Sequence, residues 1–99
     1  MKPVKMGMPA YASDGKAGRV DDVLANGETG ETVFVVIDAG GFFKGDVVVP
    51  FESVQNVTDA GVWLSLTRDE VKHAAAYDPV RHGRAAGLVS RAAGRYGED

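Results

Sequence analysis

Two short apolar runs, separated by glycines, are the clearest feature of the hydrophobic pattern. Residues 33–38, VFVVID, are mostly β-branched or aromatic, and Gly40-Gly41 interrupts the pattern shortly after them. A second run covers residues 46–49 and ends at Pro50. Both runs are too short for buried helices, and the stiff side chain of valine favours the extended conformation. The pattern therefore predicts two central strands joined by a glycine-containing connection.

Four further strand-like segments surround this central pair, and they cover residues 10–13, about 16–24, 54–57 and 62–66. Asp14-Gly15 separates the first two segments and indicates a two-residue hairpin of type I′, because glycine tolerates the positive φ of that turn. Asp21-Asp22 breaks the apolar alternation of the second segment. We therefore expect a β-bulge near these two aspartates.

A capping box predicts where a short helix begins. In Thr67-Arg68-Asp69-Glu70, the threonine hydroxyl can accept a hydrogen bond from the third amide while the glutamate reaches back to the cap amide. The helix is expected to end before Asp78-Pro79, because the residue before a proline disfavours the helical conformation. Residues 1–79 are expected to form one domain, and residues 80–99 an Arg/Gly/Ala-rich C-terminal tail that is helical or mobile.

Six short strands with turns between them, followed by one helix, predict a mainly β fold. The expected architecture is a small, mainly antiparallel β-barrel or a pair of packed sheets. Alternation along the strands assigns twelve side chains to the interior, namely Val20, Val23, Val33, Val35, Ile37, Val47, Val49, Val54, Val57, Val62, Leu64 and Leu66. A chain of 99 residues can bury one modest core of this kind without cross-links.

A second apolar stripe lies on the opposite face of the same strands. It consists of Phe34, Val36, Val48 and Trp63, with Phe42 and Phe43 in the adjoining connection. A sheet face that meets water usually carries polar residues, so this stripe needs an explanation. Three remain open: the helix or a second sheet covers it, a partner such as a second copy of the chain covers it, or it lines a small-molecule pocket.

Charge is distributed unevenly along the chain. Residues 1–79 carry seven Lys and Arg against twelve Asp and Glu, whereas residues 80–99 carry four Arg against two acidic residues. An acidic body is a poor partner for a phosphate backbone, so nucleic acid is not the expected partner of the domain. Arg84, Arg91 and Arg95 have near-helical spacing and form the alternative, a basic arm that orders on an acidic surface.

No set of residues has the spacing of a catalytic or metal site. His73 and His82 are nine positions apart, one in the predicted helix and one beyond a proline, which favours solvated histidines over a metal pair. Asp21 and Asp22 are neighbours in a strand, so their side chains face opposite ways and do not share acid–base chemistry. Asp38 is expected to support the turn at Gly40-Gly41. The sequence therefore predicts no enzyme, no cofactor and no metal ion.

The N-terminal residues, MKPVKMGMPAYASDG, contain no apolar segment of the length that a signal peptide needs. No later stretch is long enough to span a bilayer. The chain has no cysteine, which excludes disulfides, thiolate nucleophiles and thiolate metal sites but leaves the redox compartment open. A cytoplasmic location is the expectation.

Several motifs follow one another in order between about Met8 and Pro79. A DG hairpin precedes GRVDDVL, and VFVVIDAGG, DVVVPFESV and GVWLSLTRDEV follow. This order resembles the PRC-barrel family, the β-barrel shared by the cytoplasmic part of the photosynthetic reaction centre H subunit and the C-terminal domain of a ribosome-maturation factor. The matching positions are turn or core residues: Asp14, Gly15, Gly18, Val20, Val23, Asp38, Gly40, Gly41, Val49, Pro50, Val54 and Leu66.

The resemblance implies a non-enzymatic module that docks onto proteins, often as a stand-alone or self-associating domain. The chain shows neither the membrane helix of the reaction-centre subunit nor a partner domain like that of the ribosome factor, so neither specific role carries over. The preferred hypothesis is a homodimer or small homo-oligomer that forms through the apolar stripe. The alternative is an adaptor for ribosomal or nucleic-acid partners that uses the arginine-rich tail.

Overall fold

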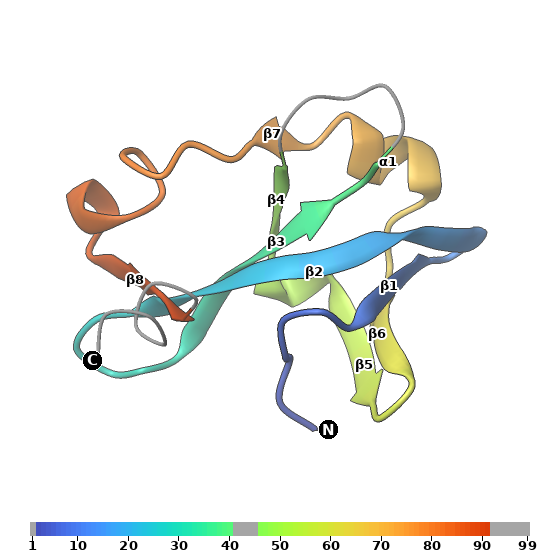
Figure 1. Cartoon of the computed structure of the whole chain (residues 1–99), viewed down its shortest axis with the longest axis horizontal. Coiled ribbons are helices and arrows are strands. Elements are labelled where there is room, and N and C mark those ends of the chain that lie inside the picture. The colour runs from blue at the N-terminus through green and yellow to red at the C-terminus, as the bar shows by residue number, and fades with distance from the viewer. Residues whose placement is uncertain (1, 41–45, 92–99) are drawn as a thin grey trace.

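The fold is a single bent sheet with one short helix beside it (Figure 1). The computed structural model describes residues 2–40 and 46–91. The elements of that part of the chain are β1 (Pro9–Ala12), β2 (Gly15–Asn26), β3 (Thr32–Asp38), β4 (Val47–Pro50), the 3₁₀ helix η1 (Phe51–Ser53), β5 (Val54–Thr58), β6 (Gly61–Leu64), α1 (Arg68–Lys72), β7 (Ala75–Ala76), the 3₁₀ helix η2 (Arg84–Ala86) and β8 (Leu88–Ser90). All six predicted strands are present, each within two residues of its expected bounds.

The strands follow the order β5-β6-β1-β2-β3-β4-β7, and β8 pairs with β2 outside this path. β1 and β6 run parallel, whereas the other neighbouring pairs are antiparallel. Within the described residues no pairing joins β5 to β7, so the sheet is not closed into a barrel. The mainly β prediction is confirmed, but the expected closure is not found, because the ladder ends at a two-residue β7 on the far side from β5.

The first hairpin turns one residue earlier than the sequence predicts. Ala12 lies opposite Gly15, so the turn residues are Ser13 and Asp14 rather than Asp14 and Gly15. No described residue other than glycine has a positive φ, so the predicted type I′ turn is wrong. A long-range contact accounts for the shift: the Asp14 carboxylate accepts a hydrogen bond from the Arg68 amide at 2.8 Å, which ties the turn to the start of α1.

The main core contains nine of the twelve predicted interior side chains together with Ala10 and Val71. Val54 and Leu66 are partly buried against this core, as their alternation indicated. Val33 is the exception, because it packs on the opposite face of the sheet. The cause is a bulge: Leu24 pairs with Phe34 and Ala25 with Thr32, which leaves Val33 as the extra residue and changes the side to which it points.

Helix α1 begins as the capping box predicts. The Glu70 amide donates to the Thr67 hydroxyl oxygen at 3.1 Å, and the Thr67 amide donates to the Glu70 carboxylate at 2.8 Å. The helix ends at Lys72, before Asp78-Pro79 as expected, after one turn that buries Val71 completely in the main core. Helix α1 therefore adds one buried side chain to the main core and does not form a separate layer.

Residues 75–91, here called the cover segment, run across the second face of the sheet (Figure 1). β7 pairs with β4 and β8 pairs with β2, while η2 lies between them. The tail was expected to be helical or mobile, and as far as residue 90 it contains a turn, the 3₁₀ helix η2 and the strand β8. Burial of Leu88 against the sheet supplies the packing that the glycine-rich sequence did not reveal. The domain boundary at residue 79 stays a prediction.

Candidate functional site

A stacked aromatic pair projects outward from the neighbouring strands β1 and β6. Tyr11 on β1 is the direct neighbour of Trp63 on the parallel strand β6, and their ring centroids are 4.9 Å apart with an interplanar angle of 23°. Alternation places Ala10, Ala12, Val62 and Leu64 in the interior, so both aromatic rings point outward. Each ring is half-buried, which leaves part of both rings in contact with water.

Gly61 makes room for this aromatic pair. A Cβ atom on Gly61 would lie 2.6 Å from the Pro9 carbonyl oxygen and 2.9 Å from Cε2 of Tyr11. The φ of Gly61 is +151°, a conformation that side chains with a Cβ rarely adopt. The close approach of β1 to β6 therefore depends on glycine at this position.

Two exposed cations flank the aromatic pair on the β2 side. Lys16 is the cross-strand partner of Tyr11, and Arg19 is the partner of Pro9, so both belong to the face that carries the rings. Neither cation makes an ion pair within the described residues. On the other side of the pair, in the turn between β5 and β6, the Asp59 side chain is 88% exposed although it pairs with Lys2 at 3.2 Å. Exposed cations therefore lie on the β2 side of the aromatic pair, and an exposed carboxylate lies in the turn between β5 and β6.

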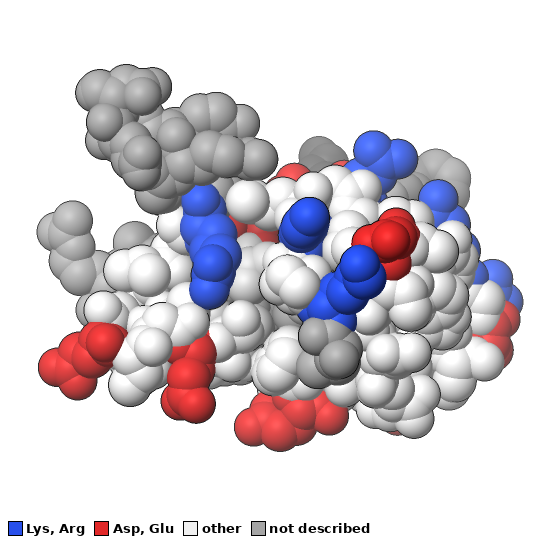
Figure 2. Space-filling model, turned by 90° about the horizontal axis from the view of Figure 1, so that it is seen from below, with Lys and Arg blue, Asp and Glu red and all other residues white. Residues whose placement is uncertain are grey.

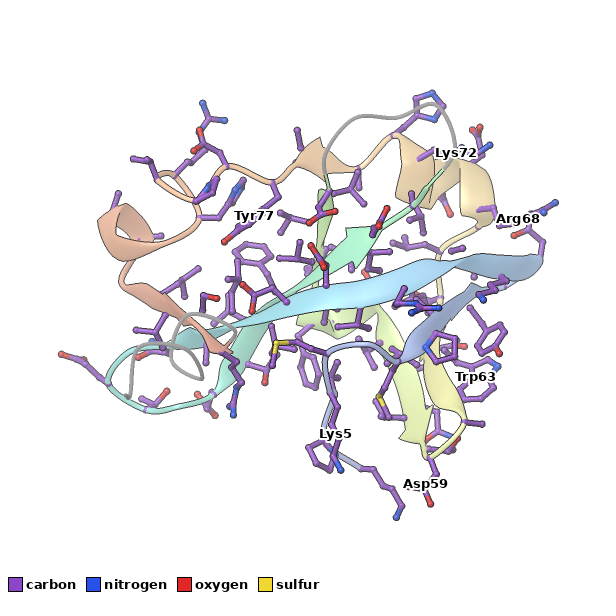
Figure 3. The ribbon with its side chains drawn as sticks, viewed as in Figure 1. Lys5, Asp59, Trp63, Arg68, Lys72 and Tyr77 are labelled. Carbon is purple, nitrogen blue, oxygen red and sulfur yellow. The ribbon has the colours of Figure 1, made fainter. Side chains whose placement is uncertain are left out.

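The predicted apolar stripe does not exist as one surface. Phe34, Val36 and Val48 pack together with Leu24 and Leu88, and Val36 and Val48 are only 0% and 5% exposed. Trp63 belongs to β6 and lies apart from them. Figure 3 shows it well away from Tyr77, which packs against this cluster. Alternation gave the outward direction of each side chain, but the parallel β1–β6 pairing sends Trp63 to another part of the bent sheet. Phe42 and Phe43 lie outside the described residues.

The cover segment provides the burial of Phe34, Val36 and Val48. Tyr77 packs against this cluster, and the His82 ring lies 6.0 Å from the ring of Tyr77 and 5.9 Å from that of Phe34. The Tyr77 amide donates to the Asp46 carbonyl at 2.8 Å, and the Ser90 hydroxyl donates to the Asp22 carboxylate. Of the three explanations for the apolar stripe, coverage by the chain itself holds for these three residues, and the covering element is the tail rather than the helix.

Four aspartates gather next to the cover segment, and we call them the carboxyl cluster: Asp21, Asp22, Asp38 and Asp46. The predicted bulge at Asp21-Asp22 is confirmed by the register shift between Val20 and Asp22. The pKa of Asp46 rises to about 7, first because burial disfavours its charged form and then because of a side-chain hydrogen bond with Asp21 and the negative charges around it. Burial and the nearby carboxylates also raise the pKa of the Tyr77 phenol.

Sequence reasoning missed Asp46 and Tyr11 as residues of interest. Asp46 immediately precedes the valine run and Asp38 ends the previous strand, so the hairpin geometry of β3 and β4 was the signal that the two lie near each other. For Tyr11 the signal was the alternation in PAYA, where two small alanines face inward and the tyrosine faces outward.

The remaining candidates make local contacts. His73 Nδ1 lies 2.9 Å from the Asp69 carbonyl oxygen, and the Asp38 carboxylate accepts the Gly40 amide at 2.9 Å, as expected for a turn. The guanidinium of Arg91 donates to the Gly30 carbonyl at 3.3 Å. The Arg84 side chain and Arg95 lie outside the described part of the structure. Among the described residues, no three acidic, histidine or cysteine side chains are grouped as metal ligands would be.

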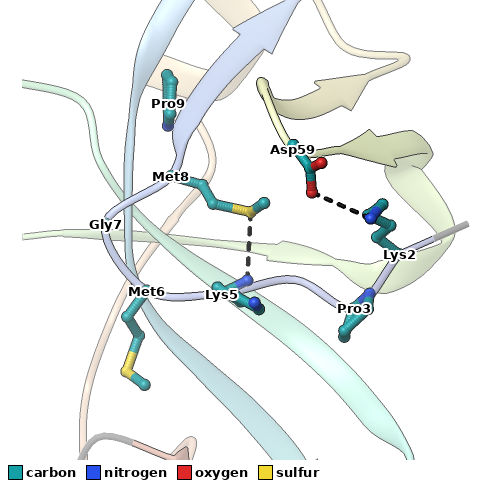
Figure 4. A pocket seen from close by; sticks show the side chains of 8 residues that line it. All are labelled: Lys2, Pro3, Lys5, Met6, Gly7, Met8, Pro9 and Asp59. Carbon is teal, nitrogen blue, oxygen red and sulfur yellow. Dashed lines mark hydrogen bonds and ion pairs between the residues drawn. The ribbon is translucent and has the colours of Figure 1, made fainter.

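The N-terminal segment borders a surface hollow of about 530 Å³ (Figure 4). Its polar groups are largely occupied, because Lys2 pairs with Asp59 and the Lys5 amide donates to the Met8 sulfur at 3.3 Å. The Lys2 amide also donates to the Val57 carbonyl at 3.2 Å, while the Asn56 side chain accepts the Val57 amide at 2.9 Å. The N-terminal segment therefore covers part of the edge strand β5 through the bond from the Lys2 amide. The hollow presents no converging polar groups for a small ligand.

The geometry defines a small β-sheet domain with an outward aromatic surface and no grouped catalytic side chains among its described residues. The PRC-barrel domain family matches residues 6–69, and the chain belongs to this family. An uncharacterized protein of Deinococcus radiodurans is 38% identical over 74 residues, which cover 73% of this chain and 27% of that protein. The chain thus spans about a quarter of the length of that relative. No described helix is long and apolar enough to cross a membrane.

Proposed function

We propose that this chain is a non-enzymatic protein-interaction module that self-associates through the face centred on Tyr11 and Trp63. The observation that carries the proposal is the stacked, half-buried aromatic pair, which points outward from β1 and β6 and has exposed charges beside it. Large aromatic side chains at the centre of a contact often supply much of its binding energy, and tryptophan and tyrosine are enriched at such positions.

The charges of this face favour a second copy as the partner. Lys16 and Arg19 lie at the β2 end, and Asp59 follows β5 at the other end. A two-fold axis along the strands, passing through the aromatic pair, would place the cationic end of one copy opposite the acidic end of the other. The Lys2–Asp59 pair is exposed and therefore weak, so Asp59 can exchange Lys2 for a cation of the second copy at little cost.

Sedimentation of Trp63→Asp against wild type tests the proposal. We expect wild type to sediment as a dimer or small oligomer at tens of micromolar, and Trp63→Asp as a folded monomer, because a carboxylate buried without a partner is costly. Val80→Asp is the matched control, since Val80 is an apolar side chain with 75% exposure that lies in the cover segment. A monomeric wild type, or a Val80→Asp variant that dissociates equally, contradicts the proposal.

Charge reversal gives a second and independent readout. Arg19→Asp should weaken association, and Asp59→Arg in the same chain should restore part of it if the two ends of the face meet. Both effects should shrink at high salt, whereas the contribution of the aromatic pair should persist. If the double variant associates no more strongly than Arg19→Asp alone, the two-fold arrangement is ruled out, but the aromatic contact is not.

The arginine-rich tail remains the alternative, as an adaptor for ribosomal or nucleic-acid partners. No contact among the described residues favours it, since Arg91 is directed to the Gly30 carbonyl. The face in Figure 2 carries its Lys and Arg side chains singly, separated by other residues, rather than in one basic patch. The cytoplasmic location stays a prediction.

A further inference from the structure

The turn that follows β2 begins at the pair Asn26-Gly27, and hydrogen bonds fix the asparagine side chain there. The Asn26 carboxamide oxygen accepts the Glu28 amide at 2.8 Å and the Thr29 amide at 3.1 Å. An asparagine that bonds to amides two and three residues ahead lies against the backbone of its own turn. Asn26 is half-buried, whereas Gly27 is exposed. The carboxamide of Asn26 is therefore held beside its own turn at the surface.

The cover segment holds the amide of Gly27. This amide donates to the Gly87 carbonyl at 2.9 Å, and the next residue, Leu88, pairs with Asn26 where β8 lies beside the end of β2 (Figure 1). A Cβ atom on Gly27 would lie 3.3 Å from the Gly87 carbonyl oxygen and 3.6 Å from a methyl group of Val89. Among the side chains of the cover segment that the structure describes, only Leu88 is buried. The hold on the Gly27 amide therefore depends largely on the packing of Leu88.

An asparagine that precedes glycine is open to attack by its own backbone. The nucleophile is the amide nitrogen of the next residue after it has lost its proton, and glycine has no Cβ that would block the approach. A bond forms between the Gly27 nitrogen and Cγ of Asn26, the bond from Cγ to the side-chain nitrogen breaks, and ammonia leaves. Water then opens the cyclic succinimide at either carbonyl and gives aspartate or isoaspartate. The net change is uptake of water and release of ammonia, without oxidation or reduction.

The hydrogen bond between Gly27 and Gly87 opposes this reaction. The Gly27 amide must lose its proton before its nitrogen can attack, and the bond that it donates stabilises the protonated form. The reaction therefore requires a local opening in which β8 leaves the end of β2. We propose that Asn26 is a site of spontaneous deamidation, and that the rate of this modification is set by how often the cover segment releases the Gly27 amide.

The isoaspartate product changes the attachment of the cover segment. In isoaspartate the chain continues through the side-chain carbons of residue 26, which adds one atom to the backbone before Gly27. The pairing of residue 26 with Leu88 and the bond from Gly27 to Gly87 depend on the normal spacing of an antiparallel ladder. The modified chain therefore holds β8 less well, and each modification records an opening permanently. This site is independent of association through Trp63, which lies on β6.

Incubation of the full chain at mildly alkaline pH, followed by peptide mapping with mass spectrometry, measures the rate at each asparagine. In wild type Asn26 should react while Asn56 stays intact, because the branched side chain of Val57 hinders the same attack. Leu88→Ala should raise the Asn26 rate about tenfold or more, because truncation of a buried leucine weakens the closed state by more than a factor of ten. Val80→Ala is the matched control, since that side chain is 75% exposed and its truncation should leave the rate unchanged.

A synthetic peptide of residues 22–31 supplies the rate of the unprotected pair. Wild type should react more slowly than this peptide, and equal rates would overturn the protective role of the cover segment. Ser90→Ala removes the hydroxyl that holds the end of β8 and is the second way to loosen it if Leu88→Ala does not fold. An Asn26 rate that neither variant raises overturns the proposal. An Asn26 that is no more reactive than Asn56 in the loosened variants also overturns it.

Discussion

Replacement of Ile37 by alanine tests the core directly. Ile37 is completely buried and lies opposite Val20 on β2 and Val47 on β4, so neighbouring strands enclose it from both sides. The substitution removes about three buried carbon groups at about 0.8 kcal/mol each, which gives roughly 2.4 kcal/mol from transfer alone. An unfilled cavity raises the expected loss of unfolding free energy to between about 2 and about 5 kcal/mol.

Urea denaturation followed by circular dichroism measures this loss. Because small domains have a total stability of about 5–15 kcal/mol, the variant should show a much lower midpoint or be unfolded without denaturant. Val80→Ala is the matched control, since that side chain is 75% exposed and its truncation should change the midpoint little. Coincident midpoints for Ile37→Ala and wild type would refute the assignment of faces in β3 and shift its register by one residue.

Two further predictions concern the helix cap and the aromatic pair. Thr67→Ala should lower the free energy of unfolding by about 0.5–2 kcal/mol through loss of both capping-box bonds, and a change within the error of urea titrations would mean that the cap contributes nothing. Gly61→Ala should lower it by about 1–3 kcal/mol and reduce the near-ultraviolet circular dichroism of the Tyr11–Trp63 pair, because the new Cβ meets Pro9 and Tyr11. Gly15→Ala has a similarly positive φ of +140°, and its new Cβ would meet only the Arg68 side chain at an ordinary 3.6 Å, so equal losses in the two glycine variants would show that the close approach of β1 and β6 is not what requires glycine.

Local sequence signals were sufficient for most of the fold. The valine runs, the glycine and aspartate turns and the capping box each act over a few residues, and they gave six strands and the start of the helix. Alternation likewise gave the direction of most core side chains, because the side-chain period of a strand is fixed. It failed at Val33, where a bulge changes the face and no single residue in the sequence marks its position.

The candidate site required information that the sequence carries only non-locally. Trp63 was correctly predicted to point outward, but its neighbour is set by the parallel pairing of β1 with β6, which lie about fifty residues apart in the chain. The packing of the cover segment was not predicted. Its glycines lower helix propensity, and the sequence does not show that Leu88 has a sheet to pack against. Asp46 was overlooked because its importance comes from three other aspartates on different strands.

The closed edge of β5 has a consequence for how this protein behaves when concentrated. The Val57 amide is taken by the Asn56 side chain and the Val57 carbonyl by the Lys2 amide, so neither group is available to a strand of another molecule. Open sheet edges are templates on which further chains add and polymerise into fibrils. Because this edge is occupied at its fourth residue, addition of a strand at that position would first have to break both bonds.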